Sequence, residues 1–471
     1  MLPICVPNLN ARWPDDVELM NVWRSGAAAV LRFITHARRW RLVAAVYARL
    51  PAHWKVRVSR GLLRSAVGTG QIAGAESQAP GVAAPRRNPE PRFAGQGVNL
   101  CGYVRSEFGL GESVRLFARG LAESGFPFSL LNFELPIPAG ERDCSLDSWL
   151  SVSAEHAASV YFVNPDQMLR ARDSLELQRH QGRYLIGYWF WELEHFPVAW
   201  LDALNLVDEV WVASSFVQRA VSSVTHKPVL RMPLPIDLSA IQPDRKKFGL
   251  PADKFVFLFT FDYHSYPQRK NPEAVIAAFC AAFPLERDDV RLLIKTVNAE
   301  RAADVHLRLV DGARGDPRIH FRDEHLRRHD MYQLIASADA YVSLHRSEGF
   351  GLGMVEAMYS GKPVVATRYS GNLDFMSDDV ACLVDCAMVD VPPGAYPHWQ
   401  GQQWAQPDLQ HAATHMRRLA DDPIAARALG AAAAARIQRQ YVPSARALAV
   451  IDRVRVIAET DAAASPKVPL N

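Results

Sequence analysis

Hydrophobic positions follow two periods that alternate along the chain from residue 97 onward. Short runs rich in β-branched and aromatic residues, such as GVNLCGYV (97–104) and KFVFLFTF (254–261), are typical of buried strands. Between such runs, apolar residues recur every three or four positions, as in SVRLFARGLAES (113–124), which predicts one buried face of a helix. Strands that alternate with helices in this way predict parallel sheets with crossover helices.

The alternation breaks once, at VLRMPLPID (229–237), and then resumes. We therefore predict two successive β/α domains, over residues 97–238 and 239–442. A further helix is predicted over 443–458, crossing back to the first domain, followed by a disordered tail over 459–471.

The residues before 97 depart from this pattern. Ten basic residues and no acidic one lie between Arg24 and Ala75, whereas the whole chain of 471 residues has a formal net charge of only +3. We interpret residues 1–65 as a basic helical extension and 66–96, rich in Ala, Gly and Pro, as a flexible linker. The basic stretch over 24–64 either packs on the body of the protein or contacts an anionic membrane surface. No nucleic-acid-binding motif accompanies the charge, which disfavours nucleic acid as a partner.

Cysteine usage and apolar runs bear on the compartment. The six cysteines are widely spaced except for Cys382 and Cys386, and no pair has the spacing of a zinc-binding motif, which favours free thiols in a reducing compartment. The N-terminus lacks the pattern of a signal peptide, and no apolar run approaches the ~18 residues that span a bilayer. We predict a cytoplasmic protein, with at most peripheral contact to the inner face of the plasma membrane.

The most informative segment is SEGFGLGMVEAM (347–358). It follows the apolar run DAYVSLHR (339–346), which predicts a buried strand, and it leads into apolar residues at helical spacing. A Gly-Phe-Gly turn between a strand and a helix exposes backbone N–H groups at the helix N-terminus, where anions bind. The flanking carboxylates, Glu348 and Glu356, either cap the helix or accept hydrogen bonds from sugar hydroxyls.

Cations occur in the same domain. Arg269 and Lys270 precede Pro272, which favours the first turn of a helix, and Lys295 lies at the end of the strand VRLLIKT. Two cations at a helix N-terminus repel its dipole, so we expect an anion between them. Arg269, Lys270 and Lys295 are predicted to converge with the amides of the Gly-Phe-Gly turn on one diphosphate, and ordinary surface cations are the alternative.

A second glycine loop, RSEFGLGE, follows the first strand of the first domain. Gly109 and Gly111 allow a tight turn before a helix, as in a phosphate-binding loop, but the spacing is not that of the dinucleotide motif GxGxxG. A plain strand-to-helix turn explains the loop equally well.

These motifs occur together in the order shown by one known family. The Glu348 and Glu356 pair around GFGLGMV, the segments RKNP and IKT, the GLGES loop and PVVATRYSGN resemble the retaining GT-B glycosyltransferases of family four, of the bacterial surface-polysaccharide type. The resemblance covers residues from about 97 to 458. It implies a GT-B fold, in which 97–238 binds the acceptor and 239–442 binds the nucleotide sugar.

The resemblance also implies roles for single residues. Glu348 is expected to bind the hydroxyls of the donor sugar and Glu356 those of the ribose, while Lys270 and Lys295, with Arg269, balance the leaving diphosphate. Glu348, Lys270 and Lys295 are thus the expected catalytic residues. The remaining expected donor contacts come from backbone, at Gly111, Gly349, Phe350, Gly351 and Leu352.

One position departs from the family pattern. Many members carry a cation after a glycine at the end of the first strand of the second domain, where this chain has Phe261 and Asp262. Asp262 cannot pair with a phosphate, so we expect Arg269 or Arg346 to replace the missing cation.

The acceptor is expected on the first domain, at the aromatic segment GYWFWELEHFPVAW (187–200). Trp189 and Trp191 can stack on a sugar, and Glu192 and His195 can offer hydrogen bonds; a buried aromatic strand end is the alternative. Asn164 and Asp166, which close the strand VYFVN, are further candidates. His345 either touches the donor or packs.

The predicted activity is transfer of a hexose with retention, by same-face attack in which the leaving phosphate takes the acceptor proton. This scheme needs no cofactor and, with no DxD motif at a strand end, no bound metal. GDP-mannose is the first candidate donor and a UDP-sugar the second, with a lipid-linked oligosaccharide or other glycan as acceptor. A degenerate scaffold subunit of a polysaccharide assembly complex is the non-enzymatic alternative; a nucleotide-sugar epimerase or a phosphorylase on the same scaffold is disfavoured by the motifs.

Overall fold

The computed structural model describes residues 96–134, 143–174, 183–238, 241–313 and 315–464, with side chains as far as Glu459. All of them belong to one compact unit, Val82–Asn471. The predicted basic extension over 1–65 lies outside the described residues, together with its membrane contact over 24–64. The linker over 66–96 also lies outside them, except for its last residue.

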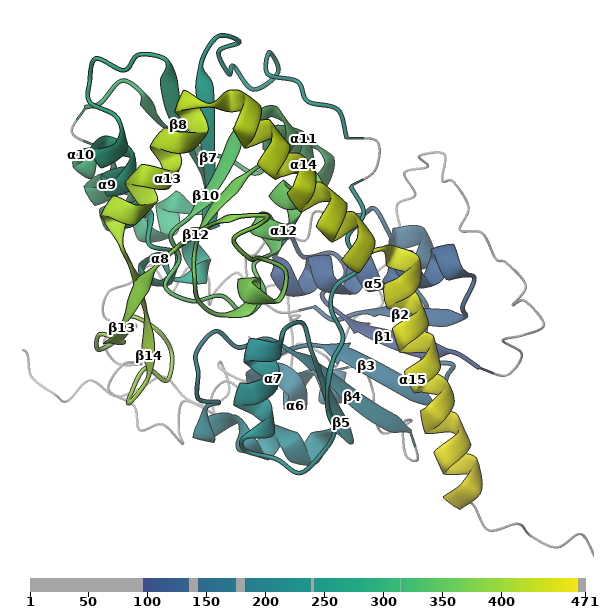
Figure 1. The fold of residues 1–471 in the computed structure, drawn as a ribbon. Coiled ribbons are helices and arrows are strands. Elements are labelled where there is room, and N and C mark those ends of the chain that lie inside the picture. Colours follow the sequence, from purple (N-terminus) through teal and green to yellow (C-terminus); the bar gives the residue numbers. More distant parts are fainter. Residues whose placement is uncertain (1–95, 135–142, 175–182, 239–240, 314, 465–471) are drawn as a thin grey trace, which may run out of the picture. The chain divides into compact units, whose positions relative to one another are not determined.

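The described residues form two six-stranded sheets, in which neighbouring strands pair in parallel (Figure 1). The first sheet has the order β2-β1-β3-β4-β5-β6 and the second the order β12-β11-β10-β7-β8-β9. The strands of the first sheet are β1 (Val98–Gly102), β2 (Phe128–Asn132), β3 (Ala158–Phe162), β4 (Tyr184–Trp189), β5 (Glu209–Val212) and β6 (Val229–Arg231). Those of the second are β7 (Phe255–Asp262), β8 (Val290–Val297), β9 (Ile319–Asp323), β10 (Ala340–Ser343), β11 (Val364–Thr367) and β12 (Cys382–Val384).

The two sheets lie on either side of the predicted break and confirm the predicted fold class of two Rossmann-like halves. We call residues 97–238 the first half and residues 239–442 the second half. Both sheets are parallel because helices connect successive strands. The helices are α5 (Gly109–Ser124), α6 (Pro165–Ser174), α7 (Ser215–Ser222), α8 (Pro267–Lys270), α9 (Pro272–Ala282), α10 (Ala303–Gly312), α11 (Arg328–Ser337), α12 (Leu352–Tyr359), α13 (Leu409–Asp421), α14 (Pro423–Gln440) and α15 (Pro443–Ala464).

Burial explains why the strands read as continuous apolar runs. In β7 the aromatic residues Phe257, Phe259 and Phe261 face α9 and the rest of one core cluster, while Val256 and Leu258 on the other face belong to a second cluster. A parallel strand is covered on both faces, so it shows no alternation of apolar and polar residues.

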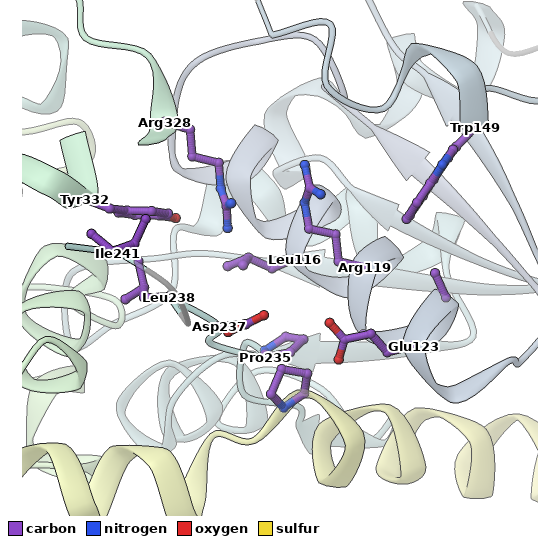
Figure 2. A pocket seen from close by; sticks show the side chains of 13 residues that line it. Leu116, Arg119, Glu123, Trp149, Pro235, Asp237, Leu238, Ile241, Arg328 and Tyr332 are labelled. Carbon is purple, nitrogen blue, oxygen red and sulfur yellow. The ribbon is translucent and has the colours of Figure 1, made fainter. Parts of the chain in front are cut away.

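The chain crosses between the halves twice. Residues 232–238 lead from β6 into the second half, and α15 returns to pack against α5 (Figure 1). Arg453 on α15 pairs with Glu209, which is fully buried at the start of β5. Helix α15 continues to Ala464, so the predicted end at 458 is too early and residues 459–464 are not a disordered tail. Side chains around the two crossings line a pocket (Figure 2).

An antiparallel hairpin, β13 (Cys386–Asp390) and β14 (Gln403–Pro407), extends from the second half and was not predicted. Its connecting segment 391–402 reaches the first half, where Gln402 Nε2 donates to the backbone oxygen of His195 at 2.6 Å. The hairpin therefore carries second-half residues to the aromatic segment of the first half. In the part of the chain that the structure describes, no helix is long and apolar enough to cross a membrane.

Candidate active site

The Gly-Phe-Gly turn lies between β10 and α12, as predicted. Gly351 precedes α12 with φ 99°, a backbone conformation that favours glycine. A side chain at Gly371 would come within 2.4 Å of the backbone oxygen of Gly349, so the 370–372 segment approaches the turn closely because glycine is there. Ser370 Oγ accepts a hydrogen bond from the backbone N–H of Glu348 at 2.9 Å. Two glycines and one hydroxyl thus fix the path of the turn.

A pocket of about 580 Å³ opens at this turn, and we call it the glycine-loop pocket. Both halves contribute to it: Phe108, Gly109, Asn164 and Glu192 come from the first half, and the turn residues 348–353 come from the second. The two halves are joined beside the turn, where Ser214 Oγ donates to the backbone oxygen of Gly349 at 2.5 Å. A pocket at the carboxyl ends of parallel strands is where ligands bind in open α/β sheets.

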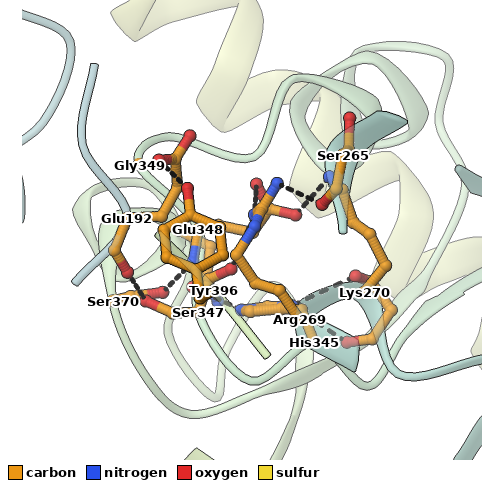
Figure 3. Close-up of polar contacts among 12 residues, drawn as sticks. Glu192, Ser265, Arg269, Lys270, His345, Ser347, Glu348, Gly349, Ser370 and Tyr396 are labelled. Atoms are coloured by element: carbon orange, nitrogen blue, oxygen red, sulfur yellow. Dashed lines mark hydrogen bonds and ion pairs between the residues drawn. The ribbon is translucent and has the colours of Figure 1, made fainter. Parts of the chain in front are cut away.

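Two cations hold Glu348 at the wall of this pocket (Figure 3). Lys270 Nζ lies 2.5 Å from Glu348 Oε1, and Arg269 Nη1 lies 3.1 Å from Oε2. Burial alone raises the pKa of Glu348, but Lys270 and then Arg269 outweigh it and lower this pKa to about 2. The anion that the sequence predicts between Arg269 and Lys270 is thus, in the described residues, the carboxylate of Glu348.

Of the two residues expected to replace the missing cation, Arg269 lines the glycine-loop pocket and Arg346 does not. The Arg269 guanidinium donates to the backbone oxygen of Ser347 at 2.8 Å. Arg346 points elsewhere, because its guanidinium stacks over Trp404 at 5.4 Å and bonds the backbone of Gln268. Asp262 has a local role: it accepts from His264 N at 2.9 Å and from Asn298 Nδ2 at 2.8 Å.

Glu356 lies in an adjoining pocket of about 220 Å³, the Glu356 pocket, which shares Phe108, Gly109 and Leu352 with the glycine-loop pocket. Burial and the nearby carboxylate of Glu112 raise the pKa of Glu356 to about 8, although Arg328 and Tyr332 act in the opposite direction. The carboxyl is therefore largely protonated at neutral pH.

Glu112 comes from the first half and is held by groups from both halves. Arg115 Nη2 lies 2.9 Å from it, while Arg328 Nε and the Tyr332 hydroxyl reach it from α11 at 2.6 and 2.9 Å. No local pattern predicts this network, because Glu112 and Arg328 lie 216 positions apart in the chain.

Lys295 also lies in the Glu356 pocket and does not line the glycine-loop pocket. Burial lowers the pKa of Lys295, an effect that Glu324 and Asp262 partly offset. The predicted convergence of Arg269, Lys270 and Lys295 at one point is therefore replaced by two neighbouring positions: Arg269 and Lys270 with Glu348, and Lys295 with Glu356.

The first-domain glycine loop differs from its prediction in one residue. A Cβ at Gly111 would lie 2.2 Å from the backbone oxygen of Ser106, so this glycine is needed inside the loop, and it lines neither pocket. Gly109 lines both pockets, and a Cβ there would meet nothing within 4 Å. Gly109, and not Gly111, is therefore the glycine of this loop that lies at both pockets.

The predicted acceptor residues separate into two groups. Glu192 and Asn164 line the glycine-loop pocket, together with Asp166 and Trp191. Trp189 does not: its indole is fully buried and stacks on Phe196 with ring centroids 6.0 Å apart. The alternative of a buried aromatic strand end holds for Trp189, since no face of the ring is open to a sugar.

His195 and His345 also lie away from the glycine-loop pocket. His195 lines a different pocket and bonds Gln402 through its backbone. His345 is fully buried, and its ring contacts Ser343 and Asn372 at 3.1 Å, while burial lowers its pKa. Of the two possibilities for His345, packing is the one that the contacts support.

Aromatic residues that the sequence analysis did not select complete the pocket. The Tyr396 hydroxyl donates to Glu192 Oε2 at 2.5 Å, and the Tyr396 ring lies 5.7 Å from the Arg269 guanidinium (Figure 3). Tyr266 lines the pocket with φ 61°, a strained backbone for a side chain of this size. The run AYPHW (395–399), with three aromatic side chains in five residues, is the sequence signal that could have identified this segment.

Part of the chain is similar to known sugar-transferring enzymes. Residues 254–390 match the family model described as "Glycosyl transferases group 1". Over 142 residues the chain is 30% identical to D-inositol 3-phosphate glycosyltransferase of Arthrobacter sp. (strain FB24), covering 29% of this chain and 33% of that protein. Over 179 residues it is 31% identical to the lipopolysaccharide core biosynthesis mannosyltransferase LpsB of Rhizobium meliloti (strain 1021), covering 32% and 47%. The chain thus spans between a third and a half of the length of these curated relatives.

Similarity to solved structures extends over both halves. Sucrose-phosphate synthase from Thermosynechococcus elongatus superposes with a TM-score of 0.58 at 18% identity, over 78% of this chain and 100% of that one. HepE of Anabaena, in complex with UDP and glucose, superposes with a TM-score of 0.54 at 14% identity, over 77% and 100%. At these identities the similarity establishes the fold, which is the two-domain GT-B type.

Proposed function

We propose that the protein is a retaining, metal-independent hexosyltransferase that uses a nucleoside-diphosphate sugar. The observation that carries the proposal is the arrangement of Glu348 and Glu356 on either side of the glycine turn, in adjoining pockets that include backbone of the first half. The match of residues 254–390 to group 1 glycosyltransferases supports the same assignment.

The donor sugar and the leaving group are assigned to the glycine-loop pocket. Glu348 accepts hydrogen bonds from the sugar hydroxyls, and the backbone N–H groups at Gly349, Phe350, Gly351 and Leu352 face sugar and phosphate. When the anomeric carbon–oxygen bond breaks, negative charge grows on the leaving phosphate. Arg269 and Lys270 are already in place against Glu348 and stabilise this charge electrostatically, without reorganisation.

The nucleoside is assigned to the Glu356 pocket. There Glu356 accepts from the ribose hydroxyls and Lys295 contributes a second positive charge toward the diphosphate. Phe108, Gly109 and Leu352 line both pockets, so a diphosphate at these residues connects the two sites. Gly109 backbone from the first half faces that position.

The acceptor is assigned to the far wall of the glycine-loop pocket, at Glu192, Asn164 and the rings of Tyr266, Tyr396 and His398. The acceptor hydroxyl attacks the anomeric carbon on the face that the phosphate leaves, and its proton passes to the leaving phosphate oxygen. Atoms and charge balance without a side-chain nucleophile. We propose a glycan acceptor, such as a lipid-linked oligosaccharide for a surface polysaccharide, reached from the cytoplasmic side of the membrane.

The donor is proposed to be GDP-mannose, with a UDP-sugar as the second candidate. The mannosyltransferase named among the relatives favours the first, and the UDP and glucose bound in HepE favour the second. A scaffold subunit without catalysis remains the alternative function, since it too would keep a nucleotide pocket.

A thermal-shift panel of GDP, UDP, dTDP, ADP and CMP tests the proposal. A nucleotide at 100 times its Kd stabilises the folded protein by about 2.7 kcal/mol, which raises the melting temperature measurably. We expect one nucleotide to do so, Glu356→Ala to abolish the shift, and Glu300→Ala, at an exposed glutamate, to leave it unchanged. Donor turnover with the nucleotide sugar so identified then separates an enzyme from a scaffold, and the anomeric configuration of the product, read by NMR, tests retention. Absence of a shift with every nucleotide would contradict the assignment.

A further inference from the structure

A further pocket lies between the hairpin β13–β14 and the segment that follows β4 (Figure 1). It has a volume of about 320 Å³, at the lower end of the range for small-molecule sites. We call it the hairpin pocket. Glu194 and His195 line it from the first half, while Asp390, Trp399 and Gln403 are among the residues that line it from the hairpin and its connecting segment. The proposed transfer leaves this pocket without a role.

The hairpin pocket adjoins the glycine-loop pocket, because the same two stretches of chain line both. After β4, Glu192 lines the glycine-loop pocket and Glu194, two residues on, lines the hairpin pocket. In the segment 391–402, His398 lines the glycine-loop pocket and Trp399, the next residue, lines the hairpin pocket. Consecutive Cα atoms are about 3.8 Å apart, so the step from one pocket to the other is short on both walls.

The two stretches also contact each other at both pockets. In the glycine-loop pocket the Tyr396 hydroxyl donates to Glu192 Oε2 at 2.5 Å (Figure 3). At the hairpin pocket Gln402 Nε2 donates to the backbone oxygen of His195 at 2.6 Å, and Gln402 Oε1 accepts from the backbone N–H of His195 at 3.1 Å. Gln402 is 5% exposed, so these bonds are shielded from water. The walls are therefore held in place before a ligand arrives, which lowers the entropic cost of binding.

The side chains of the hairpin pocket are suited to a sugar. The carboxylate of Glu194 and the indole N–H of Trp399 form no hydrogen bond with another described residue, so both can bond the hydroxyls of a ligand. The Trp399 ring is partly buried against the core cluster that contains Trp191, and the part left open can stack on a sugar ring. Asp390 Oδ1 already accepts from Gln403 Nε2 at 3.0 Å, so we assign this carboxylate no contact.

The charges of the lining disfavour other classes of ligand. None of the described residues that line the hairpin pocket is a lysine or an arginine, so a phosphate or an acidic sugar would meet two carboxylates and no permanent cation. A lipid chain would cover polar groups such as the Glu194 carboxylate without bonding them. No group of three His, Cys, Asp or Glu side chains in the described part of the chain could hold a metal ion. An uncharged, hydroxylated ligand is the class that remains.

We propose that the hairpin pocket binds the second sugar of the acceptor glycan, counted from the sugar that receives the transferred hexose. The second sugar stacks on Trp399 and its hydroxyls donate to Glu194, while the receiving sugar occupies the glycine-loop pocket at Glu192. This inference rests on the proposed function and narrows it. The acceptor ends in at least two uncharged sugars, and a monosaccharide leaves the hairpin pocket empty.

Saturation-transfer NMR on the full chain tests the site with defined probes. They are the methyl glycosides of mannose, glucose, galactose and N-acetylglucosamine and the matching homodisaccharides in each 1→2, 1→3, 1→4 and 1→6 linkage, with and without the nucleotide identified by thermal shift. We expect at least one disaccharide to bind more tightly than its monosaccharide, by a factor of about five or more, as stacking of one further ring allows. The same disaccharide with glucuronic acid as its second sugar should lose this advantage.

Two variants assign the advantage to the pocket. Trp399→Ala should raise the Kd of the disaccharide to that of the monosaccharide, whereas Trp149→Ala, at a partly buried tryptophan that lines neither pocket, should change neither Kd. Trp399→Phe keeps a ring and should retain part of the advantage. Glu194→Gln, at an exposed residue where folding is not at risk, should weaken the disaccharide only, because a neutral amide is a poorer acceptor than a carboxylate. Glu300→Gln, also exposed, is its control.

Equal affinity for each disaccharide and its monosaccharide, or no binding of any probe, would overturn the proposal. An advantage that survives both Trp399→Ala and Glu194→Gln would overturn it too, since the second sugar then binds elsewhere. These outcomes differ from a failure of the proposed function. If no nucleotide binds but the advantage of the disaccharide depends on Trp399, the glycan site stands without the transferase. If donor turnover is equally fast with monosaccharide and disaccharide acceptors, the transferase stands without this site.

Discussion

Glu348 and Glu356 occupy two ends of the same glycine turn and helix, are equally buried, and yet differ in charge. Their exposed fractions are 8% and 7%, but the pKa of Glu348 is lowered to about 2 and that of Glu356 is raised to about 8. Glu348 faces Lys270 and Arg269, whereas Glu356 faces the carboxylate of Glu112. Burial penalises both carboxylates in the same direction, so the neighbouring charges decide the difference.

The two glutamates also differ in which half of the protein supplies their charged neighbours. Around Glu348 all the charged partners come from the second half, so the site is complete within that half. Around Glu356 the partner carboxylate and its two arginines come from both halves, through Glu112, Arg115 and Arg328. The charge of Glu356 therefore depends on contact between the halves, and that of Glu348 does not.

The largest effect is expected for Glu348→Gln. The change leaves the guanidinium of Arg269 buried without its anion, and removal of one partner of a buried ion pair costs about 3–5 kcal/mol. Urea denaturation at pH 7 should show a loss of this order in the free energy of unfolding. The folded pKa of Glu348 is below its ordinary value, so its contribution is present above about pH 4.5 and is lost as the pH falls toward 2.

Glu356→Gln is the matched control, because it makes the same chemical change at the other end of the helix. The side chain it replaces is already largely neutral at pH 7, so the loss of stability should be much smaller. Equal losses in the two variants would show that the two environments do not differ in the way described.

The strands around the glycine turn could be predicted from the sequence, whereas the protonation states of Glu348 and Glu356 could not. Apolar runs marked β7, β8 and β10 because strands covered on both faces are apolar throughout. The short strands β2 and β6 were not predicted, since FSLLN and VLR are too short or too mixed to show a period. The hairpin β13–β14 was missed for the same reason.

Predictions for single residues failed where the surroundings of the residue are formed by segments that lie far away in the sequence. Glu112 approaches Glu356 because the two halves contact each other in the folded protein, which no local pattern predicts. Trp189 is an aromatic residue of the kind that stacks on sugars, but it lies in the core because both faces of the parallel strand β4 are covered. The family resemblance implies a donor contact at Gly111, and the sequence does not tell that this glycine is crowded by its own loop.

The second prediction concerns the pH dependence of stability. The pKa of Glu356 in the folded protein is about 8, above its ordinary value of 4.5. Between these two pH values the folded protein keeps a proton that the unfolded chain has already released. The contribution of Glu356 to stability therefore falls as the pH rises through this window, by at most ~1.4 kcal/mol per pH unit.

Denaturant titrations of the wild type and Glu356→Gln at pH 5, 6, 7 and 8 isolate this contribution. The difference between the two proteins should change steadily in favour of the variant as the pH rises, while other titrating groups cancel. A difference that stays constant from pH 5 to 8 would mean that Glu356 is charged in the folded protein throughout, and the contrast with Glu348 would fail.

The smallest effect is expected for Tyr396→Phe, which tests whether the Glu348 site is independent of the first half. The ring stays over Arg269, and only the hydroxyl that donates to Glu192 at 2.5 Å is lost. A hydrogen bond to a charged acceptor contributes about 1.5–3 kcal/mol, and water that reaches Glu192 from the pocket replaces part of it, so we expect a loss of about 1 kcal/mol. Tyr266→Phe, at a partly exposed ring in the same pocket, is the control and should be close to neutral.

Because we propose that the acceptor binds at Glu192 and the donor sugar at Glu348, Tyr396→Phe should also separate the two substrates. We expect the nucleotide Kd to stay within twofold of the wild type and the KM for the acceptor to rise several-fold. If the nucleotide Kd rises as much as the acceptor KM, then the ring of Tyr396 has shifted Arg269, and the Glu348 site depends on the first half after all. The charge of Glu348 would then be set, like that of Glu356, by the meeting of the two halves.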